Sequence, residues 1–161
     1  MIIVKVGMAD VKYASSPDRI RTSGLGSCVG IIIYDQYIEE CGLAHIMLPE
    51  STLARNGQIQ RAKYADTAVE DLLQYMVQKG SKANRLKAKI AGGAQMFSFS
   101  TNNEMMRIGP RNVEAVKNAL QKHKVSLISE DVGGNNGRTI EFDPSTGKLE
   151  IRTVKQGIKE I

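Results

Sequence analysis

One cysteine and one histidine offer the clearest chemistry in this sequence. Cys28 ends the segment Thr22-Ser23-Gly24-Leu25-Gly26-Ser27-Cys28, in which small residues leave room around a thiol. Glycines permit a tight turn whose successive N–H groups converge on one point, an arrangement that binds an oxyanion. We therefore predict that Cys28 is a nucleophile, with Gly24, Gly26 and Ser27 forming the loop and oxyanion support around it.

A thiol with the ordinary cysteine pKa of about 8.5 is only a few per cent thiolate at neutral pH, so it needs a nearby base. The chain has two histidines, His45 and His123. His123 stands between two lysines near the end of a predicted helix and is expected to be exposed, whereas His45 lies in an apolar strand. We predict His45 as the acid/base partner of Cys28 in an amide hydrolase. The residues alone also allow a buried cysteine and a structural histidine.

Two other kinds of site have weaker support in the sequence. Cys28, Cys41, His45 and His123 show neither CxxC nor HxxxH spacing, so no metal and no other cofactor is expected. The glycine-rich segment lacks the lysine of a P-loop, and a strand rather than a helix is predicted to follow it. A nucleotide site is therefore disfavoured.

Composition favours a soluble globular protein with a single domain over residues 1–161. Hydrophobic residues make up 42% of the chain and charged residues 24%, and the net charge of +5 is dispersed. Nucleic acid binding is not expected, because no basic stripe accompanies a reading motif. Two cysteines are too few for a disulfide scaffold. No apolar stretch is long enough for a membrane span and no signal segment is recognisable, so we expect a cytoplasmic protein without membrane insertion.

Apolar patterning predicts a chain of strands with two main helices. Strands are expected over Ile2–Val6, Val29–Tyr34, Ile38–Leu48, Leu86–Ala91, Ser126–Val132, Arg138–Asp143 and Leu149–Val154, and helices over Lys63–Lys79 and Arg111–Lys124. Residues 49–60 are expected to form an exposed loop. Because Asp35 and Gln36 would form the turn of a hairpin, the strand of His45 should lie beside the strand that follows Cys28. The fold class is α+β, with mixed and largely antiparallel sheet.

Several blocks spread along the chain resemble one family, the chemoreceptor glutamine deamidases of bacterial chemotaxis, called CheD. The blocks that carry the resemblance are Gly24-Leu25-Gly26-Ser27-Cys28-Val29, Ala44-His45-Ile46-Met47-Leu48-Pro49, Lys63-Tyr64-Ala65-Asp66-Thr67-Ala68, Lys89-Ile90-Ala91-Gly92-Gly93-Ala94, Ile108-Gly109, Arg111-Asn112-Val113 and Glu130-Asp131-Val132-Gly133-Gly134-Asn135. Ser23 and Pro110 depart from the family pattern, where leucine and alanine are expected.

The resemblance implies a catalytic triad in which Cys28 is the nucleophile, His45 the base and Thr22 the residue that orients the imidazole. It implies deamidation of glutamine side chains in methyl-accepting chemotaxis receptors to glutamate, with release of ammonia; methylesterase activity is attributed to some members. It also implies engagement of CheC, a phosphatase of the response regulator CheY. The fold it implies is a β-sandwich with flanking helices, similar to the catalytic domain of cytotoxic necrotizing factor toxins.

Two other functions stay open on the sequence. The protein could be mainly a non-catalytic binding partner and activator of CheC, or a cysteine protease that uses the same chemistry on backbone amides. Arg111, Asn112 and Asn135 could contact a substrate, although helix capping and turn formation explain these residue types equally well.

Overall fold

The protein is built from ten β-strands and two α-helices in the part of the chain that the structure describes. This computed structural model describes residues 1–54, 57, 59–96 and 107–161. The helices are α1 (Ala65–Gln78) and α2 (Ile108–Lys122). The strands are β1 (Ile3–Val6), β2 (Val11–Ser15), β3 (Arg19–Leu25), β4 (Val29–Asp35), β5 (Glu40–Ile46), β6 (Lys87–Gly92), β7 (Ser126–Val132), β8 (Arg138–Asp143), β9 (Lys148–Thr153) and β10 (Gly157–Glu160).

The strands form two five-stranded sheets. The order is β1-β3-β8-β9-β10 in the first, here called the outer sheet, and β2-β5-β4-β6-β7 in the second, the central sheet. Only the pairs β1–β3 and β6–β7 are parallel, and the other pairs within the sheets are antiparallel. The predicted α+β class with mixed, largely antiparallel sheet is confirmed.

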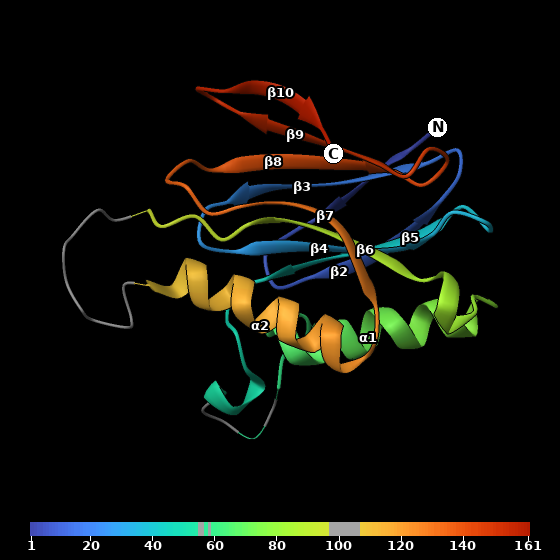
Figure 1. Ribbon diagram of the computed structural model, residues 1–161, viewed down its shortest axis with the longest axis horizontal. Coiled ribbons are helices and arrows are strands. Elements are labelled where there is room, and N and C mark those ends of the chain that lie inside the picture. The colour runs from blue at the N-terminus through green and yellow to red at the C-terminus, as the bar shows by residue number, and fades with distance from the viewer. Residues whose placement is uncertain (55–56, 58, 97–106) are drawn as a thin grey trace.

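The central sheet lies between the two helices and the outer sheet, so its two faces enclose two apolar cores (Figure 1). Strand β4 is buried at every residue, as expected of a β-branched run at the middle of a sheet. Its side chains alternate, so that Ile31 and Ile33 pack toward the helices while Ile32 and Tyr34 pack toward the outer sheet. The candidate site lies at the second of these interfaces, between the sheets.

Each helix covers the central sheet with one face. Helix α1 buries Ala68, Leu72 and Met76, which recur every four residues and share one side of the helix. Helix α2 buries Val116 and Leu120 in the same way, together with a polar residue, Asn112, one turn earlier. None of the described helices is both long and apolar enough to cross a membrane.

Most predicted elements occur in the structure, with shifted ends. Strands β7 and β8 have the predicted bounds, and β4 and β5 form the predicted hairpin, although its turn spans residues 36–39. Within the predicted loop 49–60, Ser51–Leu53 is a short 3₁₀ helix, and residues 55, 56 and 58 lie outside the described residues. Strands β2, β3 and β10 were not predicted.

The prediction that Gly24 belongs to the loop around Cys28 is wrong. Strand β3 continues through Thr22 to Leu25, with the buried residues Ile20 and Thr22 alternating with the less buried Arg19 and Arg21. A bulge interrupts its pairing with β8 between Thr22 and Leu25. Gly24 adopts a φ of +72° in this bulge. A glycine at this position therefore marks an irregularity within a strand and not the start of a loop.

Gly92, at the end of β6, is predicted to be intolerant of any side chain. Its φ is +116°, and a Cβ built there would overlap the carbonyl oxygen of Cys28. We expect Gly92→Ala to lower the free energy of unfolding by about 2 kcal/mol or more, since strained backbone and a backbone clash add. Urea denaturation measures this, with Gly7→Ala as control because a Cβ there meets no atom within 4 Å. Equal stability of the two variants would contradict the described geometry at Gly92.

Candidate active site

Cys28 lies where the chain crosses from the outer sheet to the central sheet. It follows the end of β3 and directly precedes β4, as the sequence predicts. Its side chain packs in the apolar cluster between the sheets and is 8% exposed, so the thiol is largely shielded from water but not sealed off.

His45 lies beside Cys28 on the neighbouring strand. In the β4–β5 pairing Gly30 stands opposite His45 and Val29 opposite Ile46. Cys28 comes two residues before Gly30, so it is a diagonal neighbour of His45 across the two strands. Cys28, Gly30 and His45 share the face that turns toward the outer sheet, because side chains alternate along a strand. The predicted hairpin therefore brings the predicted nucleophile and base onto one face, with the imidazole fully buried.

Thr22 reaches the imidazole from the opposite sheet. Its Oγ1 lies 2.7 Å from His45 Nδ1 and donates a hydrogen bond of 2.8 Å to the carbonyl oxygen of Val6. A hydroxyl has a single proton, so the oxygen that donates to Val6 must accept from the imidazole. Nδ1 consequently holds the proton of the neutral ring, and Nε2 keeps the lone pair that a general base needs.

Both groups of the pair are neutral at rest. Burial raises the pKa of the Cys28 thiol above its ordinary value, and burial lowers the pKa of His45. Within the described residues, Nε2 of His45 has no hydrogen-bond partner, so thiol and imidazole are not yet bonded to each other. The arrangement is that of a thiol and a base poised for proton transfer, and not of a preformed thiolate–imidazolium pair.

Hydrogen bonds to its backbone carbonyl groups hold the loop that carries Cys28. Gly26 O accepts from the N–H of Ala94 at 2.8 Å, and Cys28 O accepts from the N–H of Gly93 at 2.8 Å. Ser27 O accepts from Asn112 Nδ2 at 2.9 Å. In a planar trans peptide the N–H points away from the carbonyl, so the N–H groups of Ser27 and Cys28 face the other side of the loop.

These two N–H groups are the candidate donors for an oxyanion. A backbone hydrogen bond at Cys28 partly offsets the rise that burial causes in the pKa of the thiol. The N–H of Gly26 already donates to Gly24 O at 3.1 Å, so Gly26 supports the turn and does not supply a free donor. Of the predicted loop residues, Ser27 is the one placed to contribute its N–H.

Asn112 is the residue of this region whose role the sequence left open. It is fully buried in α2, and its Nδ2 donates to Ser27 O and, at 3.0 Å, to Met47 O. One side chain thus ties the Cys28 loop to the chain two residues beyond His45. A sequence signal existed, because Asn112 is one turn before the buried Val116 on the apolar face of the helix, where a polar residue needs a specific partner.

The other cysteine and the other histidine lie apart from this pair. Cys41 is fully buried at the far end of β5, where burial raises the pKa of its thiol, and His123 is exposed at the end of α2. Across the described ranges of the chain, no three His, Cys, Asp or Glu side chains gather in a way that would hold a metal ion.

Comparison with known proteins assigns this chain to a family. A model of the family described as CheD chemotactic sensory transduction matches residues 47–153, more than half of the chain. The chain belongs to the CheD family. The chain is 58% identical over 159 residues to the chemoreceptor glutamine deamidase CheD of Halalkalibacterium halodurans, which covers 99% of this chain and 98% of that protein. It is 54% identical to the protein of the same name from Bacillus subtilis, over 99% and 96% of the two chains.

A solved structure of different sequence shares the fold. The crystal structure of Bacillus licheniformis hypothetical protein YfiH matches 78% of this chain with a TM-score of 0.51 at 14% identity. The matched region is 51% of that protein. The likeness therefore concerns the arrangement of sheets and helices.

The tautomer of His45 is directly measurable. We expect ¹⁵N NMR at neutral pH to show His45 protonated at Nδ1 and unprotonated at Nε2, because Thr22 Oγ1 donates its proton to Val6. Thr22→Ser should keep this tautomer, whereas Thr22→Val removes the acceptor and should give a mixture of both. A dominant Nε2–H form in the wild type would contradict the assignment.

Proposed function

We propose that this protein deamidates glutamine side chains of methyl-accepting chemotaxis receptors, with Cys28 as nucleophile, His45 as acid/base and Thr22 as the residue that orients the imidazole. The observation that carries the proposal is the hydrogen bond of Thr22 to His45 Nδ1, which leaves Nε2 as a free base on the face shared with Cys28. The substrate class follows from the CheD relatives, which are named chemoreceptor glutamine deamidases.

The first stage forms a thioester. His45 Nε2 takes the Cys28 proton as the sulfur attacks the amide carbon of the glutamine side chain. The carbonyl oxygen becomes an oxyanion, and the N–H groups of Ser27 and Cys28 are its candidate donors. When the tetrahedral intermediate collapses, the carbon–nitrogen bond breaks and His45 returns its proton to the departing nitrogen, which leaves as ammonia.

The second stage restores the thiol. A water molecule gives a proton to His45 Nε2 as it attacks the thioester carbon, and the carbon–sulfur bond then breaks. The sulfur recovers the proton from His45, and the receptor side chain is left as glutamate. An ester would follow the same route with an alcohol as leaving group, so methylester hydrolysis is chemically compatible with the site.

We further propose that residues 1–161 act as one domain in the cytoplasm. The packing of the outer sheet on the central sheet, with helices beyond, supports the β-sandwich that the family resemblance implies. The similarity to cytotoxic necrotizing factor toxins stays a prediction, as does the absence of a cofactor.

Engagement of CheC is the second function that the family resemblance implies. If the main role of this protein is to bind and activate CheC, a variant without a reactive thiol should keep that role. Binding of CheC by both the wild type and Cys28→Ala, together with no change in the receptor from either, would favour this alternative over the deamidase.

The deamidase is tested by intact and peptide mass spectrometry of a receptor cytoplasmic fragment. We expect the wild type to convert selected glutamines to glutamate, and Cys28→Ala to lose this activity by about 10³-fold or more, because the nucleophile is gone. Cys41→Ala is the matched control, since Cys41 is buried away from His45. Cleavage of the fragment would instead identify a protease.

The pH profile tests the neutral resting pair. Because burial lowers the pKa of His45, the free base persists below the ordinary histidine value of about 6.5, and kcat/KM should fall only as the pH drops through that lowered pKa. Because the pKa of Cys28 is raised, thiol alkylation should increase only above the ordinary cysteine range. Rapid alkylation at neutral pH, as from a preformed thiolate, would overturn the resting state described.

A further inference from the structure

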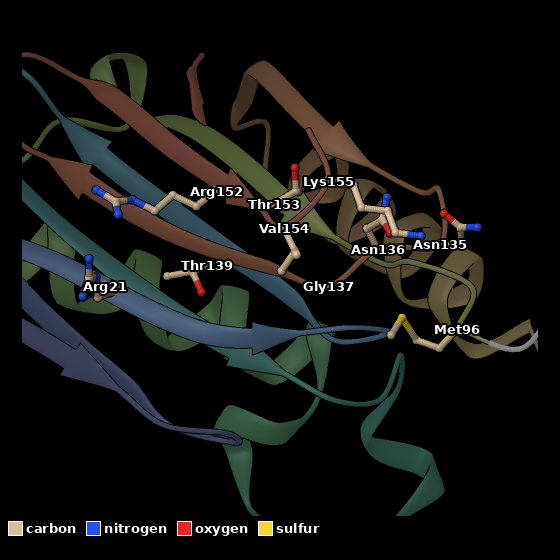
Figure 2. A pocket seen from close by; sticks show the side chains of 10 residues that line it. All are labelled: Arg21, Met96, Asn135, Asn136, Gly137, Thr139, Arg152, Thr153, Val154 and Lys155. Carbon is tan, nitrogen blue, oxygen red and sulfur yellow. The ribbon is translucent and has the colours of Figure 1, made fainter. Parts of the chain in front are cut away.

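A groove on the outer sheet leads toward the Cys28 loop. Its volume is about 640 Å³, and it extends along the outward face of the outer sheet between the turn after β9 and the segment before β8 (Figure 2). Arg21, Thr139 and Arg152 line one end, and Met96 and Asn135 the other. The groove does not include Cys28 or His45.

Two features join this groove to the site: a strand that they share and a packing contact. Arg21, which faces the groove, directly precedes Thr22, whose side chain points inward to His45, so one strand forms both the groove wall and the triad support. Met96 packs on Gly26, two residues before Cys28, with its Cγ 3.2 Å from where a Cβ of Gly26 would be. The groove therefore ends at the loop that presents the thiol.

The charged side chains that line the groove are all basic: Arg21, Arg152 and Lys155. Arg21 Nε lies 3.1 Å from Glu141 in an ion pair too bent for a hydrogen bond, and Arg152 pairs with Glu150 at 2.7 Å. Lys155 has no ion-pair partner within the described residues. Of the three basic residues that line the groove, Lys155 is therefore the one without an ion pair, and it lies toward the end where Asn135 and Met96 are (Figure 2).

Apolar surface lies next to these charges. Val154 is fully exposed and Met96 is 49% exposed, and both line the groove. A surface that combines exposed aliphatic side chains with basic ones suits an amphipathic, acidic segment of a protein. It does not suit a nucleic acid strand, because none of the lining residues is aromatic and bases would have nothing to stack on.

We propose that the groove docks an acidic stretch of the receptor next to the glutamine that is deamidated, with Lys155 and Arg152 attracting its carboxylates and Met96 and Val154 contacting its apolar side. This inference rests on the proposed function and specifies how the substrate is chosen. The groove volume of about 640 Å³ is far larger than one side chain, so the groove has room for several of the residues that flank the glutamine.

The experiment compares Lys155→Glu and Arg152→Gln with Lys82→Glu on the receptor cytoplasmic fragment. Lys82 is an exposed lysine that precedes β6, at the end of that strand opposite Gly92 and the Cys28 loop. We expect Lys155→Glu to raise KM by about threefold to tenfold with kcat retained, Arg152→Gln to raise it less, and Lys82→Glu to match the wild type. Added salt should raise KM of the wild type and have a smaller effect on Lys155→Glu.

Binding measured separately keeps this proposal apart from the deamidase. Fluorescence anisotropy with Cys28→Ala as background reports docking of the fragment without any chemistry. If the wild type leaves receptor glutamines unchanged while Lys155→Glu still weakens binding, the catalytic proposal fails and the groove proposal stands. If Lys155→Glu and Arg152→Gln bind and turn over like Lys82→Glu, or lower kcat with KM unchanged, the groove proposal is overturned.

Discussion

The hydrogen bond between Thr22 and His45 is the contact on which the rest of the site depends. Its two residues come from different sheets, so it forms only when the outer sheet packs on the central sheet at the correct spacing and register. The carbonyl oxygen of Val6 accepts the hydrogen bond of the Thr22 hydroxyl. The Thr22 oxygen must therefore accept from the imidazole, which places the imidazole proton on Nδ1. In this way the tertiary packing of two sheets, and not local sequence, fixes which imidazole nitrogen keeps the lone pair that the proposed base needs.

That packing is reinforced at the end of the sheets where Cys28 lies. Arg138, on β8 of the outer sheet, donates to Gly92 O of the central sheet and pairs with Asp131 at 3.0 Å. Gly93 and Asn112 hold the carbonyls of Cys28 and Ser27 from the other side. A thiol positioned by several backbone contacts would lose little entropy on reaching the geometry of attack, which is one of the contributions that a scaffold makes to such a reaction.

Sequence reasoning succeeded where contacts are local and failed where they are not. Cys28 and His45 could be paired because a short hairpin joins their strands, and hairpin partners follow from patterning alone. Thr22 could be placed only by family resemblance, since its contact to His45 crosses between sheets and no periodicity reports it. Asn112 stayed ambiguous because its partners are backbone carbonyls, which have no sequence signature. The groove likewise joins segments more than a hundred residues apart.

The burial that raises the pKa of the Cys28 thiol also determines when the proposed nucleophile would form. A permanently ionised cysteine would react with any small electrophile, whereas the proposed mechanism has the neutral Cys28, which is 8% exposed, give up its proton only as a bond to carbon forms. Thr22 holds the imidazole of His45, and Nε2 has no hydrogen-bond partner within the described residues, so in the proposed mechanism no hydrogen bond has to break before proton transfer begins. In the proposed mechanism, selectivity depends on which amide can reach the thiol, so the surface around the loop would determine which substrate reacts.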